Sequence, residues 1–253
     1  MITPDFTPAS LKDRPDLIAP VKEICAAAWP EFMNHDEIVG EYWWQLYENY
    51  LEYQFALLEP GSGKIAAVGN CIPMERRVVP GQLDDGGLDW ILREVCEGKP
   101  GGRLSGRTLF ALQIISAPNW RGKAVSTKTV QHMIAIGKAH KCTSLYAPVR
   151  PNRKSLYPLT PMERYVNWKT REGMPFDPWM RVHVRLGAEV VKVCPESMYM
   201  SGTVAEWESW TGLLFPESGQ YVISGALVPI LIDLANDIGM YLEPNVWMHH
   251  RIE

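Results

Sequence analysis

The stretch that decides the fold is residues 107–150, RTLFALQIISAPNWRGKAVSTKTVQHMIAIGKAHKCTSLYAPVR. An apolar run over Thr108–Ala117 predicts a buried strand, which Pro118 and Asn119 end. A basic turn and a long helical pattern follow, and Thr143–Val149 predicts a second strand. A helical crossover of this kind joins parallel strands with a right-handed connection. We therefore expect these two strands to be parallel.

The start of this helix is predicted to bind an anion. The free NH groups of a helix N-terminus point back toward the end of the preceding strand, and they favour negative charge. Arg121, Gly122, Lys123 and Ser126 cluster at that point, so a phosphate is the natural ligand. The helix has one apolar face, formed by Val130, Met133, Ile134 and Gly137.

Composition indicates an ordinary globular protein. The chain has 253 residues, which is enough for a large core, with 46% hydrophobic and 21% charged residues. No segment approaches the length of a membrane span and no secretory signal precedes the first helix, so we expect a cytoplasmic protein with no membrane partner. The net charge of -4 argues against a nucleic-acid surface. The five scattered cysteines predict buried thiols, with no metal site.

The chain before the central unit predicts two helices and a hairpin. Leu11–Trp29 has helical spacing, and so has Asp36–Tyr53. The second is apolar on more than one face, which indicates either the wall of an aromatic-lined substrate cavity or helix-to-core packing. Gln54–Leu58 and Ile65–Pro73, joined by a Gly-rich turn, predict the hairpin. The aromatic face is formed by Tyr42, Trp43, Trp44, Leu46, Tyr47, Tyr50 and Leu51.

An inserted helix is expected near residues 86–98, with Leu88–Cys96 at its centre. After Arg150 comes an ordered Pro-rich loop with a short helix near Met162–Trp168, and then a helix over Asp177–Leu186. We expect one domain over residues 1–253, with a C-terminal extension over 195–253. Later strands are predicted at Glu189–Val193, Ser197–Thr203, Gly219–Ile223 and Asn245–His249.

In this order the pieces resemble the GCN5-related N-acetyltransferase (GNAT) superfamily, over about Leu17 to Val193. Three stretches carry the resemblance: the turn RGKAVS at 121–126, the segment Asn152–Tyr157, and the ending RLGAE at 185–189. The resemblance implies an α+β (α/β) fold with a mixed, twisted central sheet of about six to seven strands flanked by helices. The chain would be an atypical member, because it has an insertion between Tyr157 and Arg181 and a long C-terminal extension.

The resemblance also implies that the protein binds acetyl-CoA or another acyl-CoA as co-substrate. The turn residues Arg121, Gly122, Lys123, Ala124, Val125 and Ser126 would hold the pyrophosphate through their backbone NH groups. The pantetheine arm would pair with the backbone of Gln113, Ile114, Ile115 and Ser116. Strands that diverge after Ala117 and Tyr146 would open a groove for the thioester. Ala124 departs from the family pattern, because glycine is usual there and alanine at positive φ costs energy.

Acyl transfer to an amine needs a base for the amine and an acid for the departing thiolate. The resemblance suggests Tyr157 as the acid, with Tyr165 as a rival and packing in the Pro-rich loop as the alternative. His183 is the preferred base, and its alternative is an ordinary histidine on the exposed side of a helix. Gln113 stands where a catalytic carboxylate would be convenient. The other candidate bases are Glu75, Glu163 and the pair His249–His250.

Basic residues outside the turn have two interpretations. Lys128, and Arg150, Arg153 and Lys154 beyond the second strand, either converge with the turn on the phosphates of the coenzyme or form a solvated surface. We expect an acyl-CoA-dependent acyltransferase, typically an N-acetyltransferase, that acts on a small amine or hydroxyl acceptor. The alternatives are action on a carrier-protein thioester, with an acyl carrier protein as partner, decarboxylation of an acyl thioester, and non-catalytic acyl-CoA binding. The oligomeric state is open, with a dimer among the options.

Overall fold

The computed structural model describes residues 5–98, 106–120 and 124–252. Within these ranges nine strands form one mixed sheet in the order β1-β2-β3-β4-β5-β9-β8-β7, and β6 pairs with β9 outside this path. The expectation of six to seven strands was too low, because two short strands, Thr7–Ser10 near the N-terminus and Ile230–Asp233 in the extension, also join the sheet. The strands are β1 (Thr7–Ser10), β2 (Gln54–Leu58), β3 (Ile65–Met74), β4 (Thr108–Ser116), β5 (Ser144–Val149), β6 (Glu189–Gly202), β7 (Gly219–Tyr221), β8 (Ile230–Asp233) and β9 (Ile238–Arg251).

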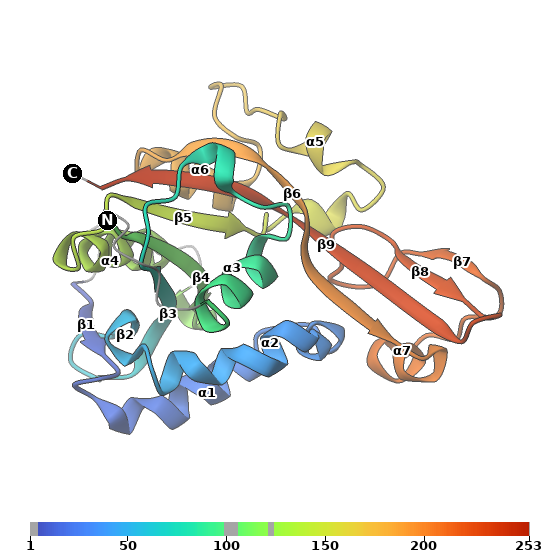
Figure 1. Cartoon of the computed structure of the whole chain (residues 1–253), viewed down its shortest axis with the longest axis horizontal. Coiled ribbons are helices and arrows are strands. Elements are labelled where there is room, and N and C mark those ends of the chain that lie inside the picture. The colour runs from blue at the N-terminus through green and yellow to red at the C-terminus, as the bar shows by residue number, and fades with distance from the viewer. Residues whose placement is uncertain (1–4, 99–105, 121–123, 253) are drawn as a thin grey trace.

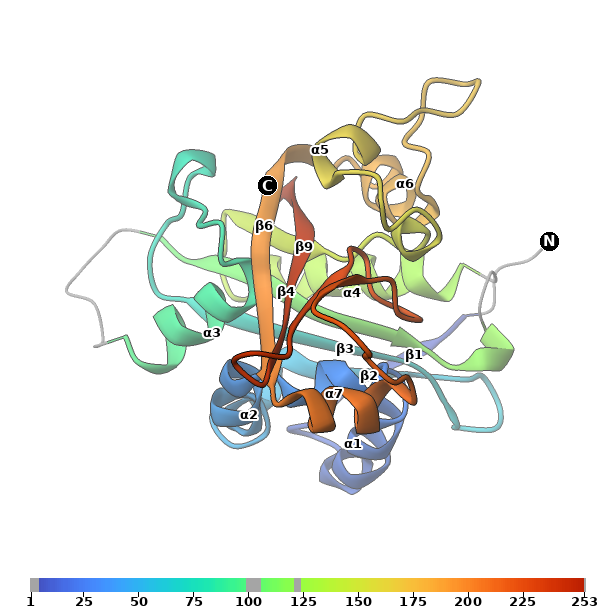
Figure 2. The same cartoon turned by 90° about the vertical axis from the view of Figure 1, so that its right-hand side faces the viewer.

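Helices cover both faces of the sheet (Figures 1 and 2). Residues of α4 pack in one core cluster with β4 and β5, and residues of α1 and α3 pack in a second cluster on the other face. Figure 2 shows α1 and α2 together below the sheet, and α5 and α6 above it. The α-helices are α1 (Ile18–Ala26), α2 (Glu37–Tyr42), α3 (Gly87–Cys96), α4 (Val125–Ala139), α5 (Met162–Tyr165), α6 (Pro178–Arg185) and α7 (Val204–Thr211).

The helix expected over Asp36–Tyr53 is broken. It begins as α2, with the Asp36 carboxylate accepting a hydrogen bond from the NH of Val39 at 2.9 Å as an N-cap. The chain then tightens into short 3₁₀ turns at Trp43–Tyr47 and Leu51–Tyr53. A regular helix would spread its aromatic side chains around the axis, whereas the tighter turns bring Leu46 and Tyr47 into the core.

The two central strands are parallel, as expected, and they separate early. β4 pairs with β5 only at Thr108–Ser144, Leu109–Leu145 and Phe110–Tyr146. Beyond these pairs β4 stays hydrogen-bonded to β3 as far as Ser116, and β5 stays hydrogen-bonded to β9 as far as Val149. The register of β3 and β4 shifts between Asn70 and Cys71, and this irregularity bends β4 where the separation begins.

The long hairpin of β6 and β9 carries the C-terminal extension away from the rest of the sheet, with α7, β7 and β8 at its far end (Figure 1). This end packs in a third core cluster, which joins Trp207, Ile230 and Tyr241 to Leu88 and Leu92 of α3. β9 pairs with β5 through its last residues and with β8 through its first residues. Because one strand belongs to both parts, we propose that the chain is a single domain. No helix in the described ranges is long and apolar enough to cross a bilayer.

Candidate active site

A cavity of about 500 Å³ opens where β4 and β5 separate. Ala111 and Ala147, the residues that follow the last pair of the two strands, both line it. Their side chains are the smallest after glycine, so they leave the gap between the strands open. The strands part after Tyr146 on β5, as the sequence predicted, but on β4 they part after Phe110 rather than after Ala117.

The cavity reaches both faces of the sheet. Trp179 and His183 of α6 line it on the face that α4 covers, and Trp43 and Tyr47 line it on the face that α1 covers. A ligand can thus extend through the sheet between the separated strands. Such an arrangement suits a reaction in which two substrates approach one another from opposite sides.

Aromatic side chains form the wall on the α1 face, which we call the aromatic wall: Trp29, Trp43, Trp44 and Tyr47. The two interpretations of this segment both hold, because Tyr47 is buried in the core and also lines the cavity. Two cations of the protein already lie against the wall. Lys22 Nζ is 4.9 Å from the ring centroid of Tyr47, and the Arg150 guanidinium carbon is 5.9 Å from that of Trp29.

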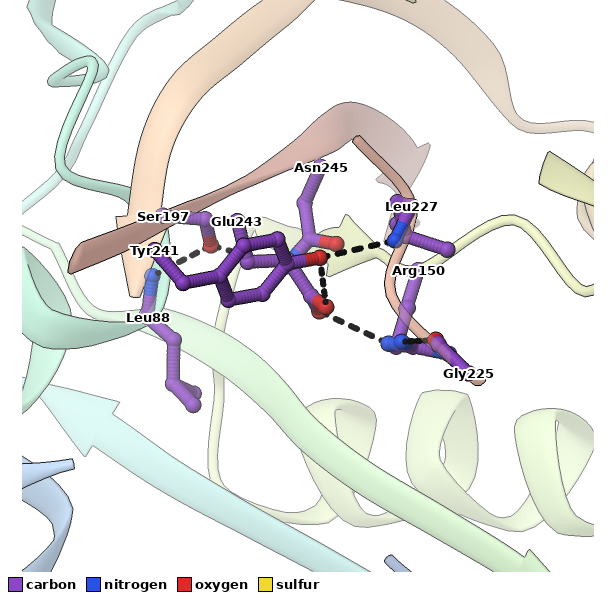
Figure 3. A network of polar contacts seen from close by, with 8 residues as sticks. All are labelled: Leu88, Arg150, Ser197, Gly225, Leu227, Tyr241, Glu243 and Asn245. Atoms are coloured by element: carbon purple, nitrogen blue, oxygen red, sulfur yellow. Dashed lines mark hydrogen bonds and ion pairs between the residues drawn. The ribbon is translucent and has the colours of Figure 1, made fainter. Parts of the chain in front are cut away.

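A buried ion pair closes the cavity at the end of β5 (Figure 3). Arg150 Nε donates to Glu243 Oε1 at 2.7 Å, and Arg150 Nη2 donates to the carbonyl of Gly225 at 2.6 Å. The Tyr241 hydroxyl donates to Glu243 Oε2 at 3.0 Å and accepts from the NH of Leu227 at 2.8 Å. Burial, the largest single effect, would lower the pKa of Arg150, but the charges and hydrogen bonds of Glu243 and Tyr241 together raise that pKa above its usual value.

Asn245 and Gln113 add neutral polar groups to the same cavity. Asn245 Nδ2 donates to Ser197 Oγ at 2.8 Å, and the same oxygen accepts from the NH of Leu88 at 3.1 Å (Figure 3). Sequence reasoning missed both Glu243 and Asn245. The available signal was the run YLEPNVW at 241–247, where two polar residues with strand spacing interrupt an apolar strand.

The predicted coenzyme-binding elements surround the cavity. The Gln113–Ser116 part of β4 hydrogen-bonds to β3 on one side, and its other edge has no strand partner among the described residues. α4 begins at Val125 without a side-chain cap among the described residues, so its first NH groups face outward from the helix start. Val125 packs in the core and Ser126 is half-buried. Arg121, Gly122 and Lys123 lie outside the described residues.

Ala124 adopts the left-handed conformation, with φ 60° and ψ 7°, directly before α4. This conformation costs an L-residue roughly 1–2 kcal/mol, and glycine avoids that cost. We expect Ala124→Gly to raise the free energy of unfolding by about 0.5–1 kcal/mol in urea denaturation. The matched control is Ala135→Gly at an exposed interior position of the same helix, which should lower it by about 1 kcal/mol. If both glycine variants lowered the free energy of unfolding by the same amount, the strain at Ala124 would be contradicted.

The structure does not bring Tyr157 to the cavity. Its ring packs against Tyr165, Trp168 and Phe176, and it is absent from the lining residues. The Tyr165 hydroxyl donates to Asp177 Oδ2 at 2.8 Å inside the same aromatic cluster. Burial and that carboxylate raise the pKa of Tyr165 above its usual value. Both tyrosines thus occupy the packing role that was the alternative to an acid.

His183 lines the cavity and is buried, so the alternative of an exposed position on its helix is wrong. Its Nδ1 lies 2.9 Å from Nε2 of His250. Burial and the neighbouring imidazole lower the pKa of His183 to about 3, and burial lowers that of His250 to about 4. A neutral imidazole pair follows, and its low pKa makes His183 a weak base. Of the other candidates, Glu75 pairs with Arg107.

Arg150 and Lys154 do not reach toward the start of α4. Arg150 is held by Glu243, and Lys154 Nζ donates to the carbonyls of Leu227 and Tyr157. Burial lowers the pKa of Lys154 to about 8. Both side chains satisfy buried acceptors of the 150–158 and 223–228 loops, so the expectation that they converge on the coenzyme phosphates was wrong for these two residues. Lys128 and Arg153 are exposed, which fits a solvated surface.

Thiol and metal chemistry find little support in the described part of the chain. Each of the five cysteines lies in the described ranges and is free, as the scattered spacing predicted. Burial raises the pKa of Cys25, which lines the cavity, to about 11, so its thiol is protonated at neutral pH. Among the described residues no three histidine, cysteine or acidic side chains come together as a metal site.

A carboxyl pair behind the cavity wall makes stability depend on pH. Asp36 Oδ2 and Asp89 Oδ2 both accept from the NH of Tyr199, at 3.1 and 3.2 Å. Burial, followed by the charge of Asp36, raises the pKa of Asp89 to about 8, and burial raises that of Asp36 as well. The folded state therefore binds a proton that the unfolded state releases near pH 4.

We expect the pair to stabilise the fold fully below about pH 4 and to lose that contribution as the pH rises to about 8. The loss is on the order of a few kcal/mol, because one pKa unit corresponds to about 1.4 kcal/mol. Asp89→Asn keeps a hydrogen-bond donor beside Asp36 and removes the shared proton. It should therefore reduce the slope of stability against pH. Melting temperature between pH 5 and 9 measures this, and parallel slopes for the two proteins would rule the pair out as the cause.

Known proteins resemble this chain in sequence and in fold. No protein-family model matches the chain. The arginine N-acetyltransferase avaD of Aspergillus versicolor is 28% identical over 279 residues, which cover 99% of this chain and 96% of that protein. The loading GNATL domain of CurA from Lyngbya majuscula has a TM-score of 0.58 at 17% identity, over 98% of this chain and 97% of that one. The GphF GNAT-like decarboxylase, solved with isobutyryl-CoA, has a TM-score of 0.57 at 16% identity, over 98% of this chain and 100% of that one.

The separated parallel strands, the helix that begins beside them and the cavity between them define a GNAT-like fold, which both solved structures share. The likeness to these proteins supports the resemblance to the GCN5-related N-acetyltransferase superfamily that the sequence had indicated. The relative and both structures match nearly all of this chain, so the C-terminal extension is part of the likeness.

Proposed function

We propose that the protein is an acyl-CoA-dependent acyltransferase that transfers an acyl group to the amine nitrogen of a small acceptor. The observation that carries this proposal is the cavity between β4 and β5, beside the free strand edge at Gln113–Ser116 and the uncapped start of α4. A pantetheine arm can pair with that edge while the helix start receives the pyrophosphate. The thioester then lies between Ala111 and Ala147.

The reaction needs a neutral amine at the thioester carbon. The nitrogen attacks the carbonyl carbon, the C–S bond breaks, and coenzyme A leaves as a thiolate that takes up a proton. The ammonium form of the acceptor must first lose a proton. Glu243 is the carboxylate among the described lining residues, and it lies at the end of the cavity where an acceptor would sit. Arg150 and Tyr241 already donate to its two oxygens, so we assign it the role of receiving that proton through water.

The name of the Aspergillus versicolor relative makes arginine the first acceptor to test. The cavity suits such a molecule, because it is long enough to pass through the sheet and combines an aromatic wall with a buried carboxylate. Acetyl-CoA is the first donor, and a longer acyl chain would extend along the space between the strands.

The test follows free thiol in solutions of acetyl-CoA with arginine or a mixed pool of amines. We expect thiol release that depends on the amine and a product whose mass is larger by one acetyl group. Release at the same rate with and without any amine would contradict the transferase, and binding of acetyl-CoA without turnover would indicate a non-catalytic protein.

Decarboxylation is the second candidate, since the GphF structure is of a GNAT-like decarboxylase and covers 98% of this chain. Malonyl-CoA is the discriminating substrate. Release of carbon dioxide without an acceptor, with the thioester left intact, would favour this candidate and would make a carrier-protein thioester the next substrate to try. The full-length relative named as an acetyltransferase supports the first candidate.

A further inference from the structure

Two buried amide oxygens in the cavity have no hydrogen-bond donor among the described residues. They are Oε1 of Gln113 and Oδ1 of Asn245. As residues, Gln113 is 8% exposed and Asn245 is 3% exposed. Leaving a buried acceptor unpaired is unfavourable, and native folds satisfy most such groups. An unpaired oxygen that faces a binding cavity indicates a partner on the ligand.

The two oxygens lie on the same face of the sheet. Ile115 is two residues beyond Gln113 on β4, and Trp247 is two residues beyond Asn245 on β9. Both Ile115 and Trp247 pack in the core cluster between the sheet and α1. Because alternate residues of a strand share a face, Gln113 and Asn245 point to that side, where the aromatic wall lies.

The fold does satisfy a buried glutamine elsewhere. Gln54 Nε2 donates to the carbonyls of Tyr50 and Cys71, each at 2.8 Å, and Gln54 Oε1 accepts from Asn70 at 3.0 Å. Gln54 is fully buried and does not line the cavity. Two glutamines of similar burial thus differ in one respect: the one without partners faces the space that a ligand would occupy.

The surrounding groups indicate what the ligand carries at this point. Glu243 shares the face of Asn245, since it is two residues away on the same strand, but its carboxylate is already paired with the Arg150 guanidinium and adds no net charge. The aromatic wall lies on the same face, and Lys22 lies against its Tyr47 ring. Two unpaired acceptor oxygens beside aromatic faces favour a group with several N–H donors over an anion or a group without donors.

We propose that Gln113 and Asn245 form a subsite for a donor-rich group of the acceptor, an ammonium or a guanidinium, and that they determine acceptor specificity. The inference rests on the proposed function and deepens it. Gln113 Oε1 and Asn245 Oδ1 accept N–H bonds from this group. A neutral molecule of the same shape offers fewer donors.

Gln113→Met tests the role of the first oxygen without breaking a hydrogen bond of the free protein. We expect its melting temperature to equal or exceed that of the unsubstituted protein, because methionine has a similar volume and no unpaired polar group. The KM for arginine should rise about tenfold, the size expected for one hydrogen bond to a charged group. The KM for acetyl-CoA should not change, since the coenzyme uses the backbone at this position.

The control is Gln54→Met, the same substitution at the satisfied glutamine. It should lower the melting temperature, because it removes one acceptor of Asn70 Nδ2 and the two hydrogen bonds that Gln54 donates to the carbonyls of Tyr50 and Cys71. A raised melting temperature at Gln54, or a lowered one at Gln113, would show that the two environments do not differ as described and would overturn the argument.

A pair of acceptors completes the experiment. Citrulline has the shape of arginine with a neutral ureido group, so we expect a kcat/KM at least about tenfold lower than for arginine, and Gln113→Met should narrow that ratio. Equal kcat/KM values in the unsubstituted protein, or a ratio that Gln113→Met leaves unchanged, would overturn the subsite while the transferase stands. Thiol release with no amine at all would overturn the proposed function itself and the subsite with it.

Discussion

Replacing Glu243 by methionine is expected to lower the free energy of unfolding by about 3 kcal/mol. The substitution leaves the Arg150 guanidinium, whose side chain is 22% exposed, without its carboxylate, and it also removes the acceptor of the Tyr241 hydroxyl. A buried cation without a partner has lost its hydration and gained no compensation. For a chain of this length each kcal/mol corresponds to roughly 2–4 °C in melting temperature.

Calorimetry of the double variant Glu243→Met with Arg150→Met separates the missing charge from lost packing. When both partners become apolar no charge is left unpaired, so most of the stability should return. The coupling between the two positions is then positive and on the order of a few kcal/mol. If the double variant instead lost as much stability as the two single variants together, the ion pair would contribute nothing beyond the packing of each side chain.

Ala147→Phe is expected to abolish binding of acetyl-CoA and to reduce kcat/KM at least about a hundredfold. The phenyl ring would enter the cavity of about 500 Å³ at the point where β4 and β5 separate, and it would occupy the place of the thioester. Because Ala147 lines this cavity, the ring can enter it without displacing neighbouring side chains of the described residues. Isothermal titration with acetyl-CoA measures the loss of binding, and thermal unfolding should show a melting temperature close to that of the unsubstituted protein.

Ala56→Phe is the control for the added volume. Ala56 is fully buried in the core of β2 and does not line the cavity. A phenyl ring there has no space and should destabilise the fold by about 1–3 kcal/mol or more. If Ala147→Phe destabilises the protein as much as Ala56→Phe, the gap between the strands is closed in solution. If it folds and still binds acetyl-CoA normally, the thioester lies elsewhere.

The central unit could be predicted because its signals are local. The apolar run of β4, the helix period of α4 and the apolar run of β5 each appear within a few residues, and the parallel pairing follows from the crossover. A groove between these two strands could be expected, but its start on β4, after Phe110, could not. The left-handed conformation of Ala124 agrees with the departure from the usual glycine noted in the sequence.

The polar end of the site could not be predicted, since it depends on contacts between distant parts of the chain. Glu243 meets Arg150 across 93 residues, and Asn245 meets Ser197 across 48. No local pattern encodes such contacts. The same limit applies to Tyr157, because its sequence segment fits the family while its ring turns into the aromatic cluster of the inserted loop. The break in the 36–53 helix likewise depends on core packing rather than on local propensity.

Hydrogen exchange with and without acetyl-CoA tests the central claim most directly. We predict slower exchange of the backbone NH groups at Gln113–Ser116 and at the first turn of α4, Val125–Thr127, when the coenzyme is present. The far end of the extension, at α7 and β8, should exchange at the same rate in both samples. Binding of acetyl-CoA that leaves both the β4 edge and the start of α4 unprotected would contradict the account.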